Sequence, residues 1–431
     1  MGRSMVRDII ELGKIVVGRR RPMSSHQALR DRRLRAVVRN AYEHVPYYRD
    51  RFRAAGISPE DIRSADDLHK VPVTTKDDLR AAGMANTISR RVDVSGCIMR
   101  TTSGSTGKPF AVFRTRSEER TRLQFQMAAL LTAGLRPLDR FVMLIAEWEA
   151  PRRLHTRLGL FQREVVRVSR PIEEQIRRLR ELRPTVLWTW PSALRSLMHF
   201  VEGPFREVVN PRILITNAEI LDPHLRNRVK TELDTELFNF YGACEFGRIA
   251  WECKAHEGLH INGDHLIVEC VDGDLNPLPF NHTGTIVVTS LYSFAMPFIR
   301  YNLNDLGMLK EAKCSCGSPL PLMAPPMGRE TEVLRLPSGR IMPPLELLNL
   351  MSSFNKVDQF RFVQEATDLL RVELVMREGR DPSTEETVRT KIRDYLKEPV
   401  RVEVVTKKDP SVSSSKFRVI VSNGGSRRST P

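Results

Sequence analysis

Along the middle of the chain, short continuous apolar runs alternate with segments in which apolar residues recur at a helical period. Short apolar runs such as Phe141–Ile145 are typical of strands buried on both faces, and segments with a helical period lie between them. We expect strands at 141–145, 186–188, 212–216 and 237–239, and helices at 117–131 (with Ser117 as cap), 171–182, 191–202 and 222–233. This alternation predicts a largely parallel sheet with helices on both faces, whose ligands lie at the carboxyl ends of the strands.

The flanking regions show other patterns. Residues 24–56 have an imperfect helical stripe that breaks at Val45-Pro46, because proline disfavours helix in the residue before it. We predict that strand 98–100 pairs with 110–113 in a hairpin. From about 258 to 301 the residue pattern is typical of β-strands. After Gly328-Arg329 the pattern starts again, with a hairpin at 333–342, helices at 344–353 and 383–396, and strands at 360–364, 370–376 and 400–405.

These patterns predict an α/β protein in three parts. A large N-terminal domain, 1–328, combines mainly parallel sheet and helices with a β-rich subdomain. A small α+β domain follows at 329–422, and the polar residues 423–431 are expected to be a disordered tail.

Composition fits a globular protein of the cytoplasm. The 431 residues are 41% apolar and 28% charged, and no apolar run approaches the roughly 18 residues of a membrane span. The net charge of +16 is spread along the chain, mostly as arginine, and no nucleic-acid-binding motif accompanies it. A solvated basic surface explains this charge, and weak attraction to acidic partners stays open. Nothing in the sequence indicates an oligomeric state.

A glycine-rich stretch carries the first chemical signal. Thr101–Pro109 combines hydroxyl residues with Gly104, Gly107 and Lys108. Glycines let backbone N–H groups turn towards an anion, and the hydroxyl groups and lysine add donors. The stretch is not a Walker A loop, because Thr102 and Pro109 occupy positions that need glycine and a hydroxyl residue. Its chemistry suits a polyphosphate, and a plain flexible turn is the alternative.

Cysteine and histidine form a second candidate site. Among six cysteines, Cys253, Cys314 and Cys316 could join His256 in a four-ligand structural zinc site. His260 lies on the same short segment and could replace His256. The alternative is free buried thiols and a surface histidine.

Several motifs in order resemble a known family. The segments Val45–Arg49 and Val71–Leu79 and the loop Thr102–Pro109 are similar to the phenylacetate–CoA ligase-like branch of the acyl-adenylate-forming (AMP-binding) enzymes. This branch includes relatives from capsule biosynthesis. The resemblance extends from about Tyr42 to Val421 and implies an adenylating domain followed by a small mobile C-terminal domain.

The resemblance assigns roles to further residues. It implies that ATP is held by Thr102, Ser103, Gly104, Ser105, Thr106 and Gly107, by Asn217, Ala218 and Glu219, by Tyr241 and Gly242, and by Asp305 and Arg329. Tyr241 would stack on adenine, Asp305 would accept from the ribose hydroxyls, and Glu245 would hold Mg²⁺. Lys108, Glu245 and Lys416 would be the catalytic residues. The chain departs from the family pattern at Cys244, Thr331 and Ser415.

The resemblance implies a two-step ligase. A small carboxylic acid would react with ATP to give an acyl-adenylate and pyrophosphate. Trp148 and Trp190 would suit an aromatic or an extended apolar acid, and plain packing is the alternative for both. A thiol, coenzyme A above all, would then take the acyl group. The alternatives are an adenylating enzyme of capsule or polysaccharide biosynthesis with another acceptor, and a catalytically inactive basic binding protein on the same fold.

Overall fold

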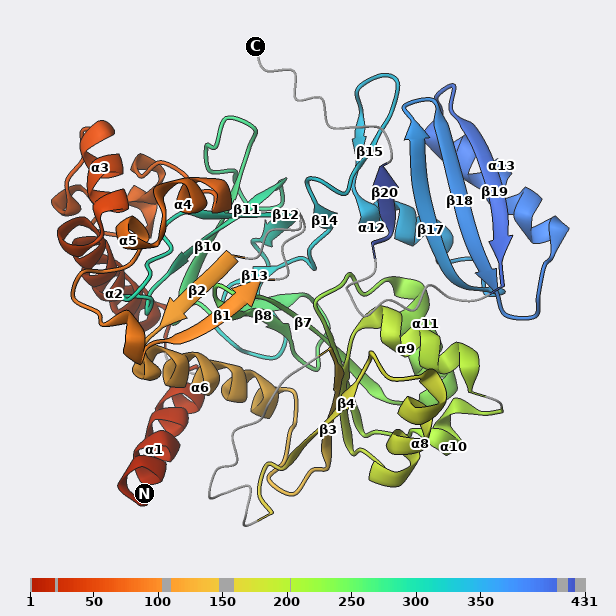
Figure 1. Cartoon of the computed structure of the whole chain (residues 1–431), viewed down its shortest axis with the longest axis horizontal. Helices are drawn as coiled ribbons and strands as arrows, with labels where there is room; N and C mark the ends of the chain where they lie inside the picture. Colours follow the sequence, from red (N-terminus) through yellow and green to blue (C-terminus); the bar gives the residue numbers. More distant parts are fainter. Residues whose placement is uncertain are drawn as a thin grey trace. The chain divides into compact units, whose positions relative to one another are not determined.

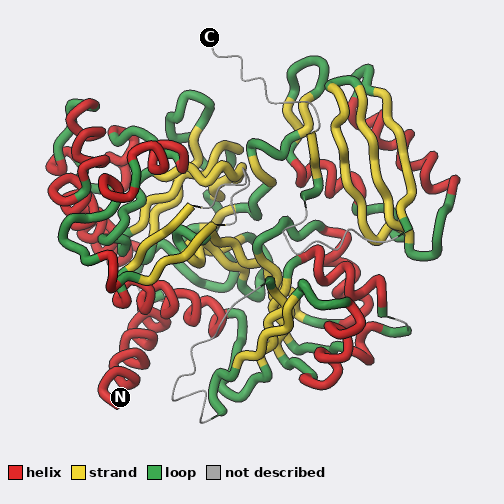
Figure 2. The backbone as a smooth tube through the Cα atoms, in the orientation of Figure 1, coloured by secondary structure: helices red, strands yellow, loops and turns green. Residues whose placement is uncertain are grey.

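A computed structural model gives the fold and describes residues 2–19, 22–102, 110–146, 159–201, 203–408 and 418–422. By their contacts the residues divide into two compact units, each built from two separate stretches of chain. Unit 1 comprises 1–134 and 240–326, and unit 2 comprises 135–239 and 327–431. Strands and helices both contribute throughout the two units, as expected for the predicted α/β class (Figure 2).

Unit 1 begins with a helical region. Its elements are α1 (Gly2–Gly18), α2 (Met23–His44), α3 (Pro46–Ala54), α4 (Lys76–Ala82), α5 (Met84–Thr87) and α6 (Arg116–Thr132), with short 3₁₀ turns at Pro59–Asp61, Ala65–Lys70 and Val94–Gly96. The predicted break at Val45-Pro46 is confirmed, since Val45 is extended and Pro46 opens α3. The apolar faces of α2 and α3 pack on Ile267, Leu291 and Ile299 from the second stretch of the unit.

The strands of unit 1 are antiparallel. The hairpin of β1 (Ile98–Thr102) and β2 (Phe110–Arg114) has the predicted pairing, with Thr102 opposite Phe110. A larger sheet has the order β10-β11-β12-β13-β9-β8-β7. Its strands are β7 (Glu236–Ala243), β8 (Gly247–Glu252), β9 (Leu259–Ile261), β10 (Leu266–Val271), β11 (Thr283–Ser290), β12 (Tyr301–Lys310) and β13 (Leu322–Met323).

Two local predictions for unit 1 need correction. The N-cap of α6 is Thr115 and not Ser117, because Thr115 forms a reciprocal capping box with Glu118. Tyr241 and Gly242 were expected just beyond a strand, but they lie inside β7, where Tyr241 pairs with Ala250. Gly242 permits this pairing, since a Cβ there would stand 2.3 Å from the carbonyl oxygen of Gly247.

The first stretch of unit 2 contains the parallel sheet that the alternating pattern predicts, with β4 as a strand that was not predicted. Strands β3 (Phe141–Ile145), β4 (Arg163–Arg167), β5 (Val186–Thr189) and β6 (Ile213–Asn217) pair in parallel in the order β4-β3-β5-β6. Helices α8 (Ile172–Leu182), α9 (Pro191–Phe200), α10 (Phe205–Val208) and α11 (Pro223–Leu233) connect them or follow them. One apolar core includes Leu144, Leu187 and Leu214 of the strands together with Leu179 of α8 and Leu197 of α9.

The second stretch of unit 2 has its own apolar core. It contains β14 (Gly328–Arg329), the hairpin β15 (Leu334–Arg335) and β16 (Ile341–Met342), α12 (Pro344–Met351) and α13 (Pro382–Leu396). A four-stranded sheet has the order β19-β18-β17-β20, formed by β17 (Val357–Ala366), β18 (Leu369–Met376), β19 (Arg401–Lys407) and β20 (Ile420–Ser422). Helices α12 and α13 lie behind this sheet in Figure 1 and add Leu347 and Ile392 to its core.

The predicted domain limits stay predictions. The contact boundary between Pro326 and Met327 lies close to the predicted limit at 328/329, but the contacts group residues 327–431 with 135–239. The tail 423–431 lies outside the described residues. In the described part of the chain, no helix combines the length and the apolar character needed to cross a membrane.

Candidate nucleotide and metal sites

Tyr241 and Asp305 meet in unit 1. Tyr241 comes from β7 and Asp305 from β12, and both are partly exposed. The Tyr241 phenol donates a hydrogen bond of 2.7 Å to Oδ2 of Asp305. Two residues that lie 64 positions apart in the sequence are therefore held together. The pair presents an aromatic ring next to a carboxylate that can accept from hydroxyl groups.

Glu245 is a buried carboxylate with two partners. The residue follows the end of β7 and is only 5% exposed. The Tyr301 phenol donates to Oε1 at 3.0 Å, and Nζ of Lys76 lies 3.5 Å from the same oxygen. Burial, reinforced by the negative charge of Glu245, raises the pKa of Tyr301, so this phenol stays protonated and remains a donor. A fixed carboxylate of this kind is the hard oxygen ligand that Mg²⁺ prefers.

Lys76 is brought to Glu245 by backbone pairing. The N–H of Thr74 donates to the carbonyl of Arg300 at 2.8 Å, and the N–H of Asn302 donates to the carbonyl of Thr74 at 2.9 Å. Thr75 then caps α4, in which Lys76 is the first residue. The sequence singles out this segment only by its family resemblance, because a lysine after two threonines carries no chemical signal of its own.

Cys244 replaces the threonine of the family motif. Its Sγ lies 3.8 Å from the carbonyl oxygen of Thr101 in β1. Burial, with a contribution from the neighbouring Glu245, raises the pKa of this thiol above its ordinary value. Cys244 is therefore a neutral, weak donor near pH 7.

The predicted segment 217–219 and Arg329 lie in unit 2. Asn217 ends β6, and its Oδ1 accepts from the indole N–H of Trp188 at 2.6 Å. Ala218 has a left-handed backbone with φ of 70°. The Glu219 carboxylate accepts from the N–H and the hydroxyl of Ser192 at 2.8 Å each, at the start of α9. Arg329 ends β14, and its carbonyl accepts from the N–H of Glu332 at 3.0 Å.

Several predicted residues lie outside the described part of the chain. They are the loop residues Ser103, Gly104, Ser105, Thr106, Gly107 and Lys108, the pocket candidate Trp148, and the catalytic candidate Lys416. Of the predicted loop, Thr102 is described, as the last residue of β1.

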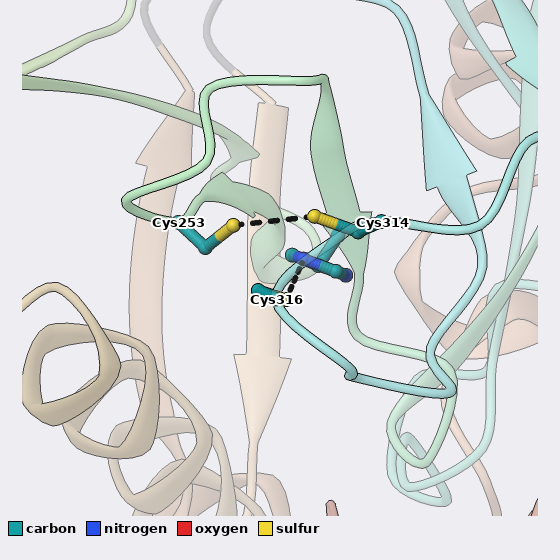
Figure 3. Close-up of side chains that lie close together, drawn as sticks. Cys253, Cys314 and Cys316 are labelled. Carbon is teal, nitrogen blue, oxygen red and sulfur yellow. Dashed lines mark hydrogen bonds between the residues drawn. The ribbon is translucent and has the colours of Figure 1, made fainter.

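Three cysteines and one histidine converge in unit 1. The ligand atoms of Cys253, His260, Cys314 and Cys316 all lie within 4.8 Å of one another. Figure 3 shows the sulfurs of Cys253 and Cys314 facing each other, with Cys316 close by. The Sγ atoms of Cys253 and Cys314 are 3.5 Å apart, and Sγ of Cys316 is 3.3 Å from Nε2 of His260.

Of the two histidines that the sequence left open, His260 is the one in this cluster. His256 instead lies with its Nδ1 3.2 Å from the Glu252 carboxylate. The reason is the path of the chain: His256 falls in the turn after Cys253, whereas His260 lies in β9, which pairs with β13 beyond Cys316. The sequence-based set with His256 is therefore replaced by one with His260.

The cluster geometry fits a tetrahedral ion. Zinc–sulfur and zinc–nitrogen bonds of about 2.3 and 2.0 Å place two tetrahedral sulfur ligands roughly 3.8 Å apart and a sulfur and a nitrogen ligand roughly 3.5 Å apart. The contacts of 3.5 Å between two sulfurs and 3.3 Å between sulfur and nitrogen are slightly shorter than these separations. Cys253, His260 and Cys314 are buried and Cys316 is exposed, so such a site would border the protein surface.

Comparison with known proteins gives sequence relatives. No protein-family model matches the chain. It is 30% identical over 335 residues to a phenylacetate–coenzyme A ligase of Thermus thermophilus, which covers 75% of this chain and 74% of the relative. A phenylacetate–coenzyme A ligase of Escherichia coli is 30% identical over 293 residues, covering 66% of this chain and 67% of the relative.

Solved structures share the fold. A 2-hydroxyisobutyryl-CoA ligase in its postadenylation state has a TM-score of 0.81 at 20% identity, with 94% of this chain and 92% of that chain covered. An anthranilate CoA ligase in complex with anthranoyl-AMP has a TM-score of 0.58 at 13% identity, with 79% and 68% covered. At these identities the likeness is one of fold.

Proposed function

This chain belongs to the phenylacetate–coenzyme A ligase family of adenylate-forming enzymes, and from that premise we propose that it activates a carboxylic acid with ATP and transfers the acyl group to coenzyme A. The observation that carries the proposal is the pairing of motif residues in unit 1. Tyr241 bonds to Asp305, and Tyr301 bonds to Glu245. Motifs from separate parts of the sequence thus supply a ring, a hydroxyl-accepting carboxylate and a metal-binding carboxylate.

These residues suit the binding of a nucleotide. The ring of Tyr241 offers an aromatic face for adenine, and Asp305 accepts from ribose hydroxyls. Glu245 would hold Mg²⁺, which supplies positive charge to the phosphates when it is bound. The side chains of Asn217 and Glu219 are engaged by Trp188 and Ser192. We therefore assign the contacts of this segment to its main chain.

In the first step, an oxygen of the acid attacks the α-phosphorus of ATP. The bond from the α-phosphorus to the oxygen that bridges it to the β-phosphorus breaks. Pyrophosphate leaves with this oxygen and with the electrons of the broken bond. Like charge on the two reactants opposes this attack, so cationic groups must offset it. Lys108, the N–H groups of the glycine loop and Lys416 keep this role as proposals that rest on the family motifs.

In the second step, a thiol attacks the acyl carbon and gives up its proton, the bond from that carbon to the phosphate oxygen of AMP breaks, and AMP leaves with the bonding electrons. We propose coenzyme A as the acceptor and a hinge at Arg329–Thr331 that withdraws Lys416 before this step. Moving a domain between two half-reactions is an established way to assemble and dismantle a site. We place the reaction in the cytoplasm as part of the same proposal.

Acid-dependent exchange between pyrophosphate and ATP tests the first step. With Mg²⁺ and a panel of phenylacetate, benzoate, anthranilate and short aliphatic acids, we expect exchange with at least one acid. Folded protein that exchanges with none of them would exclude the ligase function and favour the inactive binding protein. Lys416→Ala should remove most of the exchange, and an unchanged rate would take Lys416 out of the mechanism.

The acceptor is tested by replacing exchange with product formation. Adding coenzyme A to the active acid should give a thioester in stoichiometry with AMP. Exchange without thioester, together with amide formation on an amino sugar, would favour the polysaccharide alternative. An aromatic acid remains our proposal for the substrate. Trp190, the one of the two tryptophan candidates that the structure describes, packs against the apolar core of unit 2. The panel of acids therefore tests whether the substrate is aromatic.

We also propose that Cys253, His260, Cys314 and Cys316 hold a structural zinc ion. The proposal is supported by the convergence of four suitable ligand atoms within 4.8 Å. Four protein ligands leave no open position, so the ion would stabilise structure and take no part in the chemistry. It would join the end of β8 and the strand β9 to the segment between β12 and β13.

Metal analysis of protein purified without a histidine tag tests this site. We expect one zinc per chain, lost in Cys316→Ser and retained in Cys97→Ser, which changes a partly exposed cysteine elsewhere. The thiol of Cys316 is the informative one because it is exposed. It should resist alkylation until a chelator is added, and rapid alkylation of the wild type before any chelator is added would refute the site.

A further inference from the structure

We propose that Arg114 is a positioning residue that fixes the main chain carrying Glu245 to the hairpin β1–β2. The inference rests on the proposed function, because its consequence is for the binding of magnesium and ATP. Arg114 is the last residue of β2, and its side chain is only 5% exposed. Sequence motifs give it no role, since it lies beyond the glycine loop and outside every family segment.

The guanidinium of Arg114 binds two successive carbonyl groups. It donates to the carbonyl of Cys244 and, at 2.8 Å, to the carbonyl of Glu245. These residues lie in the turn between β7 and β8, beyond the last strand pair of Ala243 with Gly247. Buried carbonyl groups need donors, and a charged planar donor can serve two of them at once.

A carboxylate of α6 lies near Arg114 and is shared with a second arginine. Glu119 lies 3.9 Å from Arg114 and forms a two-pronged ion pair with Arg122 at 2.7 Å. A second tie joins the same turn to the hairpin, because Sγ of Cys244 lies 3.8 Å from the carbonyl of Thr101 in β1. The Cys244–Glu245 turn therefore contacts both strands of the hairpin.

Glu245 is held from two directions as a result. Tyr301 and Lys76 contact Oε1 of its carboxylate, and Arg114 contacts its carbonyl. Strand β1 ends at Thr102, the first residue of the predicted phosphate loop, and β2 begins at Phe110, directly after that loop. Arg114 thus couples the position of the metal-facing carboxylate to these two strands. A carboxylate fixed before binding costs less to order when magnesium and ATP arrive.

Two substitutions test the inference. Arg114→Met keeps the length and apolar stem but removes the donors, and Arg114→Lys keeps the charge without the planar fork. Arg33→Met is the matched control. Arg33 also donates to a main-chain carbonyl, that of Asp264 at 3.0 Å, and its replacement removes the same single positive charge. Circular dichroism and thermal unfolding establish folding for each. If Arg114→Met does not fold, Arg114→Lys carries the test.

The first readout does not depend on activity. Amide hydrogen exchange of residues 243–248 should be faster in Arg114→Met than in wild type, and intermediate in Arg114→Lys. Calorimetric affinity for ATP with Mg²⁺ should fall roughly tenfold, as expected for the loss of charge-assisted hydrogen bonds, while affinity for ATP without Mg²⁺ changes little. Arg33→Met should match wild type in both measurements.

Other results would overturn the inference. Wild-type hydrogen exchange and wild-type magnesium dependence in Arg114→Met would show that the turn does not need Arg114. An equal loss of ATP affinity with and without Mg²⁺ would show a general disturbance and not a positioning role. Failure of the ligase function itself is a separate outcome, seen as absence of pyrophosphate exchange in wild type, and leaves the hydrogen-exchange comparison valid.

Discussion

At the residue scale, the Tyr241–Asp305 pair separates two contributions to nucleotide binding. The ring supplies an apolar face, and the carboxylate supplies acceptors. The phenol of Tyr241 already uses Oδ2 of Asp305, so one carboxylate group serves both the protein and, in our proposal, the ribose. The two side chains can be altered one at a time because each role belongs to a different group.

We predict that Asp305→Asn raises the KM for ATP by about 10- to 100-fold, because a hydrogen bond to a charged acceptor is worth about 1.5–3 kcal/mol. Tyr241→Phe, which keeps the ring, should change the same KM only severalfold. Initial rates of pyrophosphate exchange at varied ATP measure both. Asp274→Asn, on an exposed turn, is the control. A larger effect for Tyr241→Phe than for Asp305→Asn would contradict this division of roles.

His265 gives unit 1 a dependence on pH. Its ring is buried and stacks on Phe125 at 4.7 Å between centroids. Burial, assisted by the positive charges of Arg122, Arg114 and Arg33, lowers its pKa from 6.5 to about 3. Between these two values the unfolded chain binds the proton and the folded chain does not. The free energy of unfolding therefore falls as the pH is lowered through this window.

We predict that His265→Gln weakens this dependence by up to about 1.4 kcal/mol per pH unit, the most that one proton can contribute. Urea unfolding at several pH values between 4 and 7 measures the slope for wild type and variant. The exposed histidine in His282→Gln serves as control and should leave the slope as it is. Parallel curves for wild type and His265→Gln would show that His265 protonates freely in the folded protein.

At the scale of elements, Asp358 joins β17 to two helices of unit 2. It is only 1% exposed. Its carboxylate contacts Nη1 of Arg228 on α11 and Nδ1 of His199 on α9, each at 2.7 Å. Arg195 of α9 donates to its carbonyl at 3.2 Å and pairs with Asp222, the N-cap of α11. One buried carboxylate therefore organises contacts from three elements.

We predict that Asp358→Asn destabilises unit 2 by about 3–5 kcal/mol, because removal of one partner leaves a buried charge without compensation. Urea unfolding followed by hydrogen exchange of β17 locates the loss. Glu386→Gln, which removes an exposed partner of Arg389 on α13, should have little effect. Equal stability of the two variants would mean that water or rearranged side chains replace Asp358 without cost.

Regular elements were the part of the fold most open to prediction. The parallel strands follow from short continuous apolar runs, and the helices between them from a period of 3.6; in the structure β5 is buried at every position, as such a run predicts. The predicted strand 237–239 was too short, since β7 extends from Glu236 to Ala243 and includes Tyr241 and Gly242. Only the approach of Gly247 from the next strand shows that glycine is needed inside the strand.

The candidate site was predictable where residues are named by motifs. Motifs named Tyr241, Glu245 and Asp305 as candidates. The structure adds that Tyr241 bonds to Asp305 and that Tyr301 bonds to Glu245. Arg114 was missed, because a lone arginine after a strand has no periodic or compositional signature. The choice of His260 over His256 also needed three dimensions, since both histidines follow Cys253 on one short segment and only the fold shows that His260, in β9, faces the other ligands.

At the scale of the whole molecule, the two stretches of each unit differ in how much they need each other. The core of 327–422 is made almost entirely of its own residues, with Ile220 as an outside contribution. The helices of the first 134 residues instead bury their apolar faces against residues from 267 to 299. Independence is thus expected for one stretch and not for the other.

We predict that a fragment of residues 327–422 folds alone, while a fragment of residues 1–134 does not. Proton–nitrogen NMR spectra should be dispersed for the first fragment, with one cooperative thermal transition, and collapsed for the second. Adding residues 240–326 in trans provides the control for the second fragment. A dispersed spectrum of 1–134 alone would show that α2 and α3 need no cover from Ile267, Leu291 and Ile299.

The pairing of Thr74 with Arg300 and Asn302 has a consequence for the life of the nascent chain. During synthesis, residue 74 leaves the ribosome long before residue 302 is made. At roughly 5–20 residues per second, the wait is about 10–45 s. Throughout that interval the apolar faces of the first helices lack their final cover. We therefore expect chaperones to bind the early part of the chain during synthesis. The yield of folded protein in cells should depend on them more than the final stability of the protein suggests.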